Sequence, residues 1–138
     1  SIGPVLAEIS GVTALTDVTG FGLAGHLAEI MSASELDAEL SYARIPRLPN
    51  LASYIDQDCV PGGTHRNYAS VKQHLPKLDD HQKAILCDPQ TSGGLLVSVR
   101  PESVDEVTTV LREMGLPCEP IGRLCAQSGV DSVLTLHE

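Results

Sequence analysis

A carboxylate, two threonine hydroxyls and three glycines occur together in residues 16–25, which read TDVTGFGLAG. An apolar run precedes this segment and an amphipathic helical pattern follows it, so we expect a strand-to-helix turn. A helix N-terminus offers unpaired backbone N–H groups and the positive end of the helix dipole to an anion. Glycine lets a ligand approach the backbone closely, and Asp17 supplies a hard oxygen ligand suited to Mg2+. The segment therefore predicts a turn that meets a phosphate or a metal ion.

Two other interpretations of the same glycines stay open. Residues 20–25 match G-x-G-x-x-G, and Asp37 and Glu39 follow roughly 20 residues on, as in dinucleotide-binding domains. That interpretation needs a buried parallel second strand, and it leaves Asp17 beside a pyrophosphate with no cation between them. In the third interpretation the glycines serve only a tight turn and the close packing of the helix.

Two further segments combine glycine with hydroxyl or amide side chains. The TSGG turn, residues 91–94, could form an anion-binding nest of consecutive N–H groups or a plain turn into a strand. It lacks the lysine of a Walker A motif. The PGGT segment, residues 61–64, together with Asn67, fits either a flexible substrate lid or an ordinary surface loop.

The histidines and cysteines give weaker signals. His26 lies one turn into the expected helix, away from its apolar stripe, and is interpreted as a surface or packing residue. His65 and Arg66 could help bind a phosphate from the PGGT loop. No Ser-His-Asp or Cys-His order indicates a nucleophile, so no catalytic residue is assigned. The cysteines form no CxxC pair and are interpreted as reduced thiols of a cytoplasmic protein; they are Cys59, Cys87, Cys118 and Cys125.

The elements that must position these residues follow from hydrophobic periodicity and turn signals. Strands are expected at 12–18, 36–40, 95–99, 120–124 and 132–136, with the strand at 36–40 half-buried and solvated on its Asp37 face. Helices are expected at 22–31, 51–56, from Asp80 to Leu86, and from Pro101 to a stop at Gly115, and residues 59–69 are expected to be a loop. This order favours an α/β sandwich with a mixed, largely antiparallel sheet.

Composition narrows the range of partners. The chain has 138 residues, the size of one domain, and a net charge of −9. That charge argues against a protein that binds a nucleic-acid backbone or an anionic membrane surface. Residues 1–10 show a helical spacing without a cap, which suggests the remnant of a preceding helix and a chain that is one domain of a longer protein.

Three segments together resemble one family. They are residues 16–23 (TDVTGFGL), the PGGT segment with Asn67, and residues 86–96 (LCDPQTSGGLL). This combination resembles the C-terminal half of selenophosphate synthetase, also called selenide, water dikinase, in the aminoimidazole ribonucleotide synthetase-like superfamily. The resemblance covers nearly the whole chain, from about residue 11 to the last strands.

The resemblance implies an activity that needs more than this chain. The family converts ATP, selenide and water to selenophosphate, AMP and orthophosphate, requires Mg2+ and usually K+, and serves selenocysteine biosynthesis. Its N-terminal domain pairs across a homodimer and carries a glycine-rich segment with the catalytic Cys or selenocysteine. That segment has no counterpart here, so residues 1–138 are expected to be the C-terminal domain alone, inactive by itself. The family fold for this domain is a three-layer α/β/α sandwich, partly ferredoxin-like.

The resemblance also implies roles for individual residues. Asp17 matches the family's aspartate that helps hold Mg2+ at the ATP phosphates. The residues expected beside the nucleotide are Thr19, Gly20 and Gly22. A possible substrate loop comprises Gly62, Gly63, Thr64, Asn67, Thr91, Ser92 and Gly93. A stand-alone nucleotide-binding or metal-binding module is the alternative from another functional class, and a dinucleotide-binding domain is a third.

Overall fold

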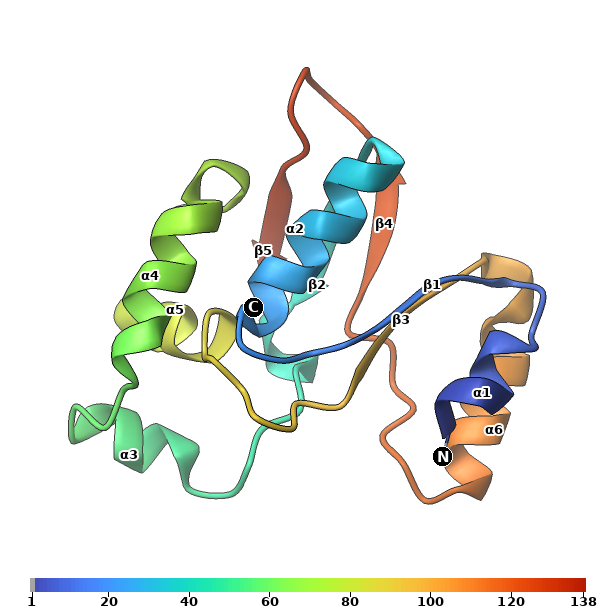
Figure 1. Cartoon of the computed structure of the whole chain (residues 1–138), viewed down its shortest axis with the longest axis horizontal. Coiled ribbons are helices and arrows are strands. Elements are labelled where there is room, and N and C mark those ends of the chain that lie inside the picture. Colours follow the sequence, from blue (N-terminus) through green and yellow to red (C-terminus); the bar gives the residue numbers. More distant parts are fainter. Residues whose placement is uncertain (1) are drawn as a thin grey trace.

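The computed structural model describes residues 2–138, and Ser1 of the expected helical remnant lies outside the described residues. Figure 1 shows the arrangement of the elements. The helices are α1 (Ile2–Ala7), α2 (Gly22–Ser34), α3 (Leu51–Asp56), α4 (Gly62–Val71), α5 (Asp80–Leu86) and α6 (Val104–Glu113). The strands are β1 (Val12–Asp17), β2 (Leu36–Ser41), β3 (Leu95–Val99), β4 (Gly122–Ala126) and β5 (Leu134–His137). The expected mixed α/β fold is therefore confirmed.

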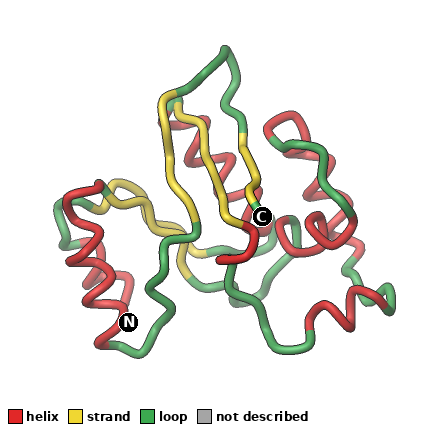
Figure 2. Tube along the Cα trace, turned by 180° about the vertical axis from the view of Figure 1, so that it is seen from behind, coloured by secondary structure: helices red, strands yellow, loops and turns green. Residues whose placement is uncertain are grey.

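The strands form two small sheets, not the single sheet expected from the sequence. β1 pairs antiparallel with β3 in a two-stranded ribbon. In the second sheet β2 lies between β4, to which it is antiparallel, and β5, to which it is parallel. The mixed and largely antiparallel character is thus confirmed, whereas a continuous sheet is wrong. Within residues 2–138, α2 lies against one face of the three-stranded sheet (Figure 1), and no helix lies in front of the other face (Figure 2), so the expected third layer is not found there.

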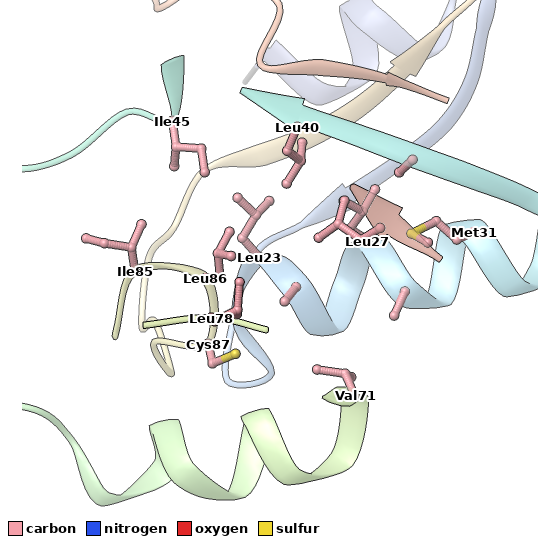
Figure 3. Close-up of a cluster of buried hydrophobic side chains, with 14 of the residues drawn as sticks. Leu23, Leu27, Met31, Leu40, Ile45, Val71, Leu78, Ile85, Leu86 and Cys87 are labelled. Atoms are coloured by element: carbon pink, nitrogen blue, oxygen red, sulfur yellow. The ribbon is translucent and has the colours of Figure 1, made fainter. Parts of the chain in front are cut away.

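The main core is aliphatic and lies between α2, the three-stranded sheet, and helices α4 and α5 (Figure 3). Leu23, Leu27 and Met31 recur at helical spacing along α2 and are all buried. Ala38 and Leu40 of β2 close the opposite side. A smaller cluster holds α1 and α6 against the β1–β3 ribbon; its buried members are Leu6, Ile9 and Val107.

Asp37 lies on the face of β2 that was expected to be solvated, yet it is only 6% exposed. The loop at residues 127–133 folds over it. Its Oδ2 accepts hydrogen bonds from the Ser128 hydroxyl (2.6 Å) and backbone N–H (2.9 Å), and its Oδ1 accepts one from the Val133 N–H (2.9 Å). These donors, the Ser128 hydroxyl first, lower the pKa of the Asp37 carboxyl. Alternation along the strand could not reveal this burial, because the covering loop is remote in sequence.

The expected loop at residues 59–69 is wrong, because most of it belongs to α4. Pro61 precedes the helix with extended backbone, a conformation that suits a helix start. Two glycines at the start of a segment disfavour a helix by propensity alone. Here tertiary packing decides, because Thr64 and Val71 of α4 are both buried.

Several element boundaries also differ from expectation. The bounds of α5 agree with expectation, and the residue that caps it is Asp79, through a reciprocal capping box with Gln82. β4 and β5 begin at Gly122 and Leu134, two residues later than expected in each case. Pro101–Ser103 forms a separate 3-10 turn before α6. The expected stop at Gly115 is confirmed by its left-handed φ of 67°. None of the helices in residues 2–138 combines the length and apolar character needed to cross a bilayer.

Candidate functional site

Asp17 is the last residue of β1, and its side chain is exposed. Opposite it in the β1–β3 ribbon stands Leu95, the first residue of β3. Within residues 2–138 the Asp17 carboxylate takes part in no hydrogen bond and no ion pair. The same part of the chain contains no group of three or more His, Cys, Asp or Glu side chains placed to hold a metal ion. Asp17 is therefore an isolated, accessible oxygen donor at the end of a strand.

The turn that follows Asp17 is held by backbone hydrogen bonds to the residues around the TSGG turn. The Val18 N–H donates to the Gly94 carbonyl (2.8 Å), and the Gly93 N–H donates to the Val18 carbonyl (3.1 Å). The Gln90 N–H donates to the Thr19 carbonyl (3.1 Å). Because the Gly93 N–H is engaged in this way, the TSGG turn is not a nest of free consecutive donors. It supports the turn after β1.

Asn67 connects that turn to two helices. Its Nδ2 donates to the Gly20 carbonyl (2.8 Å) and to the Cys87 carbonyl (3.0 Å) at the end of α5. Next to it, a Cβ on Gly63 would stand 2.8 Å from Pro89 Cγ. The three segments that carry the family resemblance, far apart in the sequence, thus meet at one place. The Asn67 amide donor is committed to this framework.

Each glycine of the pattern G-x-G-x-x-G has a different surrounding. Gly22 has a φ of 73°, and a Cβ there would stand 2.8 Å from the Asp88 carbonyl oxygen. A Cβ on Gly25 would stand 2.7 Å from the Cβ of Phe21. Gly20 is exposed, and nothing lies within 4 Å of the position of its missing Cβ. Gly22 and Gly25 therefore serve the turn and the packing, and Gly20 alone leaves open space for a ligand.

His26 is a packing residue, as one of its two expected roles had it, but it also makes polar contacts. The residue is 7% exposed. The Thr19 N–H donates to His26 Nε2 at 3.2 Å, and the Thr19 hydroxyl lies 3.2 Å from the same nitrogen. The sequence pattern shows that His26 leaves the apolar stripe but not that it faces back to the turn.

The sequence reasoning missed Asp88 as a residue of this region. It follows α5, and its carbonyl oxygen would stand 2.8 Å from a Cβ added to Gly22, so the Asp88 backbone packs against the turn. Its side chain is half-buried, and burial raises the pKa of the Asp88 carboxyl. Its place in the segment 86–96, which carries the family resemblance, was the available signal.

The dinucleotide interpretation is wrong. It requires two parallel neighbouring strands around the helix, but β1 pairs antiparallel with β3 and β2 belongs to the other sheet. Of the two acidic residues of that pattern, Asp37 is enclosed by the 127–133 loop, and Glu39 forms a two-pronged ion pair with Arg123 at 3.0 Å per contact. Neither carboxylate is placed to meet a ligand held by the turn after β1.

The remaining candidates divide by exposure. Thr91, Ser92 and Gly93 are exposed, as are His65 and Arg66 on α4. Thr64 is 1% exposed, and its hydroxyl has no hydrogen-bond partner within residues 2–138. Thr64 is therefore a core residue of α4 and not part of an open loop.

Comparison with known proteins assigns the sequence of the chain to a family. The sequence model described as "AIR synthase related protein, C-terminal domain" matches residues 2–135. The chain belongs to this family. This AIR synthase related domain is also 60% identical over 111 residues to the selenide, water dikinase of Shewanella sp. (strain ANA-3) and 59% identical to that of Shewanella baltica (strain OS185). In both cases the match covers 80% of the chain and 32% of the relative, so the domain spans about a third of these relatives. The resemblance to selenophosphate synthetase is confirmed.

Solved structures agree on the fold. The Escherichia coli hydrogenase maturation protein HypE superposes on this AIR synthase related domain with a TM-score of 0.62 and 19% identity. The superposition covers 96% of the domain and 33% of the HypE chain. At this identity the match shows a shared fold and nothing about shared chemistry.

Proposed function

We propose that this domain is the C-terminal part of an ATP-dependent selenide, water dikinase and supplies one wall of its Mg–ATP site. The observation that carries the proposal is the convergence of three sequence segments on one hydrogen-bonded turn. At its start stands Asp17, whose carboxylate has no partner within residues 2–138. The identity to the Shewanella relatives supports the reaction class, the formation of selenophosphate, AMP and phosphate from ATP, selenide and water.

Asp17 would bind Mg2+ through its exposed carboxylate. The donor chemistry fits, because Mg2+ prefers carboxylate oxygens and retains several waters while it leans on substrate phosphates. A single carboxylate is not a complete site, so the other ligands would come from the substrate and the N-terminal domain. When bound, Mg2+ neutralises phosphate charge and orients the scissile bond. No residue of the chain is assigned to K+.

The framework around Asp17 would keep the nucleotide side of the site rigid. Gly20 leaves space for the phosphates, and Thr19 lies between it and Asp17 in the chain. The exposed residues Thr91 and Ser92 would line the rim of the same wall. In this proposal the chain itself places one metal ligand and holds the turn around it in a fixed position. The N-terminal domain of a cytoplasmic homodimer supplies the nucleophile and the remaining carboxylates.

A chimera tests the proposal directly. The chain replaces the matching third of the Shewanella sp. (strain ANA-3) enzyme, and AMP and selenophosphate are measured after addition of ATP, selenide and Mg2+. We expect turnover by the chimera, none by the isolated chain, and none by an Asp17→Asn chimera. A folded but inactive chimera, or turnover by the isolated chain, would refute the proposal.

The alternative of a stand-alone nucleotide-binding module is separated by calorimetry on the isolated chain. Because one carboxylate binds Mg2+ weakly, titration with Mg–ATP should give no micromolar binding. Saturable micromolar binding without the N-terminal domain would favour the module.

A further inference from the structure

His26 is a buried ionisable residue whose side chain contacts the turn at Thr19, and the proposed function does not use it. It lies in the second turn of α2, with its ring beneath that of Phe21; the two ring centroids are 5.8 Å apart at an interplanar angle of 61°. Phe21 is itself 60% exposed and covers the imidazole from outside. The imidazole is therefore largely removed from solvent.

The partners of His26 fix its tautomer. A backbone N–H can only donate, so the Thr19 N–H at 3.2 Å requires a lone pair on Nε2. The ring proton of the neutral imidazole must then be on Nδ1. Nδ1 is buried and has no hydrogen-bond partner within the described residues 2–138, and the Glu29 carboxylate lies 3.3 Å from it. A carboxylate beside an N–H is attracted, whereas a carboxylate beside a lone pair is repelled, so Glu29 favours the same tautomer.

This tautomer determines what Thr19 can offer to a ligand. The Thr19 hydroxyl lies 3.2 Å from Nε2. A hydroxyl lone pair that faced the lone pair of Nε2 would be repelled, so the hydroxyl directs its hydrogen to the ring and shares the single Nε2 lone pair with the Thr19 N–H. The Thr19 carbonyl in turn accepts from the N–H groups of Gln90 (3.1 Å) and Gly22 (3.0 Å). Both donors of Thr19 are thus engaged, and its hydroxyl lone pairs are the groups that remain.

We infer that His26 is a positioning residue that presents Thr19 to the site as a hydrogen-bond acceptor only. An acceptor is complementary to a cation or to a water bound to it, and it repels a phosphate oxygen. Thr19 would therefore stand on the Mg2+ side of the ligand, next to Asp17, and not on the phosphate side. The identity of this ligand rests on the proposed function, whereas the tautomer and the contacts of Thr19 do not.

The tautomer is tested on the chain itself by NMR with 15N-labelled histidine. We expect His26 to show a protonated Nδ1 and an unprotonated Nε2, and the Thr19 amide to be protected from hydrogen exchange. His26→Leu should accelerate exchange at Thr19 by about five- to tenfold, the factor expected for one lost hydrogen bond. His26→Gln should retain the protection, because its Oε1 reaches the place of Nε2 and accepts. His81→Gln, an exposed change on α5, is the matched control and should leave Thr19 unchanged.

A proton on Nε2 in that spectrum would overturn the inference, and so would equal Thr19 protection in the leucine and wild-type chains. If the leucine variant does not fold, the spectrum and the glutamine variant still decide.

The ligand side is tested in the chimera with Thr19→Val, which removes the hydroxyl and keeps the shape. We expect a several-fold higher Mg2+ concentration for half-maximal activity and an unchanged KM for ATP at saturating Mg2+. Thr19→Ser, which keeps the hydroxyl, should restore the Mg2+ dependence that Thr19→Val loses. A raised KM for ATP with unchanged Mg2+ dependence would place Thr19 on the phosphate and refute the inference. An inactive unsubstituted chimera would refute the proposed function and the assignment of Mg2+ that rests on it, while the spectrum would still decide the role of His26.

Discussion

Substitution of Gly22 by alanine should destabilise the domain more than the same change at Gly20 or Gly94. Its φ of 73° is left-handed, which costs an L-residue about 1–2 kcal/mol. In addition, the new Cβ would stand 2.8 Å from the Asp88 carbonyl oxygen and 2.9 Å from the Cys87 carbonyl carbon. Both neighbours are backbone atoms at the end of α5, so the chain must shift, at an overpacking cost of about 1–3 kcal/mol. The sum is a loss of about 2–5 kcal/mol from a total of about 5–15 kcal/mol.

Two other glycines separate these contributions. Gly94 also has a left-handed φ, 86°, but nothing lies within 4 Å of its missing Cβ, so Gly94→Ala should cost only the backbone strain of about 1–2 kcal/mol. Gly20 has neither a positive φ nor a neighbour within 4 Å, and Gly20→Ala should change stability by no more than about 0.5 kcal/mol. The three variants thus form a graded series in which only Gly22 combines strain with collision.

Urea unfolding followed by circular dichroism measures the series. We expect the midpoints to fall in the order Gly20, Gly94, Gly22, with equal slopes, because the surface exposed on unfolding does not change. If Gly22→Ala cost no more than Gly94→Ala, the close approach of α2 to the end of α5 would be wrong. In the chimera, Gly20→Ala should lower activity despite its unchanged stability, because its methyl would occupy the open space that the proposed function gives to the phosphates.

Three further perturbations address other parts of the framework. The Ser128 hydroxyl is the first cause of the lowered pKa of the folded Asp37 carboxyl. The carboxylate therefore stabilises the fold above the ordinary pKa of an unfolded aspartate, and this contribution is lost as pH falls through the lower folded-state pKa. Urea midpoints below about pH 4 should drop less steeply in Asp37→Asn than in the wild type. Burial raises the pKa of the Cys87 thiol from 9.0 to about 11. At pH 8 its thiolate fraction is therefore about 100-fold lower than that of an ordinary thiol. A disulfide reagent should label exposed Cys59 in the folded protein, but Cys87 only after unfolding. Asn67→Ala should cost about 2–3 kcal/mol in urea unfolding, because two carbonyls lose their donor; an unchanged midpoint would show that water replaces the amide.

Features that depend on neighbouring residues could be predicted from the sequence. The strand and helix around the turn follow from local periodicity, and their bounds agree at the start of β1 and of α2. Gly115 ends α6 because a single residue supplies the left-handed conformation. The three segments of the family resemblance were also recognisable as sequence strings.

Features that depend on remote contacts could not be predicted. α4 begins with two glycines, and it is stable because Thr64 and Val71 are buried against other elements. Asp37 is covered by a loop from the far end of the chain. The turn of His26 toward Thr19 requires the course of the backbone between them. In each case the contact that decides the local structure is made with a residue remote in sequence, and hydrophobic periodicity carries no information about such contacts.

Some polar groups at the turn have hydrogen-bond partners in the chain, and the Asp17 carboxylate does not have one in residues 2–138. A mutation of Asp17 can therefore affect a ligand without affecting the stability of the turn. Val18, Thr19 and Gly20 each have their carbonyl engaged by another part of the chain, whereas the Asp17 carboxylate has no partner in residues 2–138. A group without internal contacts contributes little to stability, and a framework residue contributes little directly to a ligand. Asp17→Asn should therefore leave the urea midpoint of the chain within about 0.5 kcal/mol of the wild type while it abolishes activity in the chimera. A large loss of stability would mean that the carboxylate has an internal structural partner, and the metal role would lose its main support.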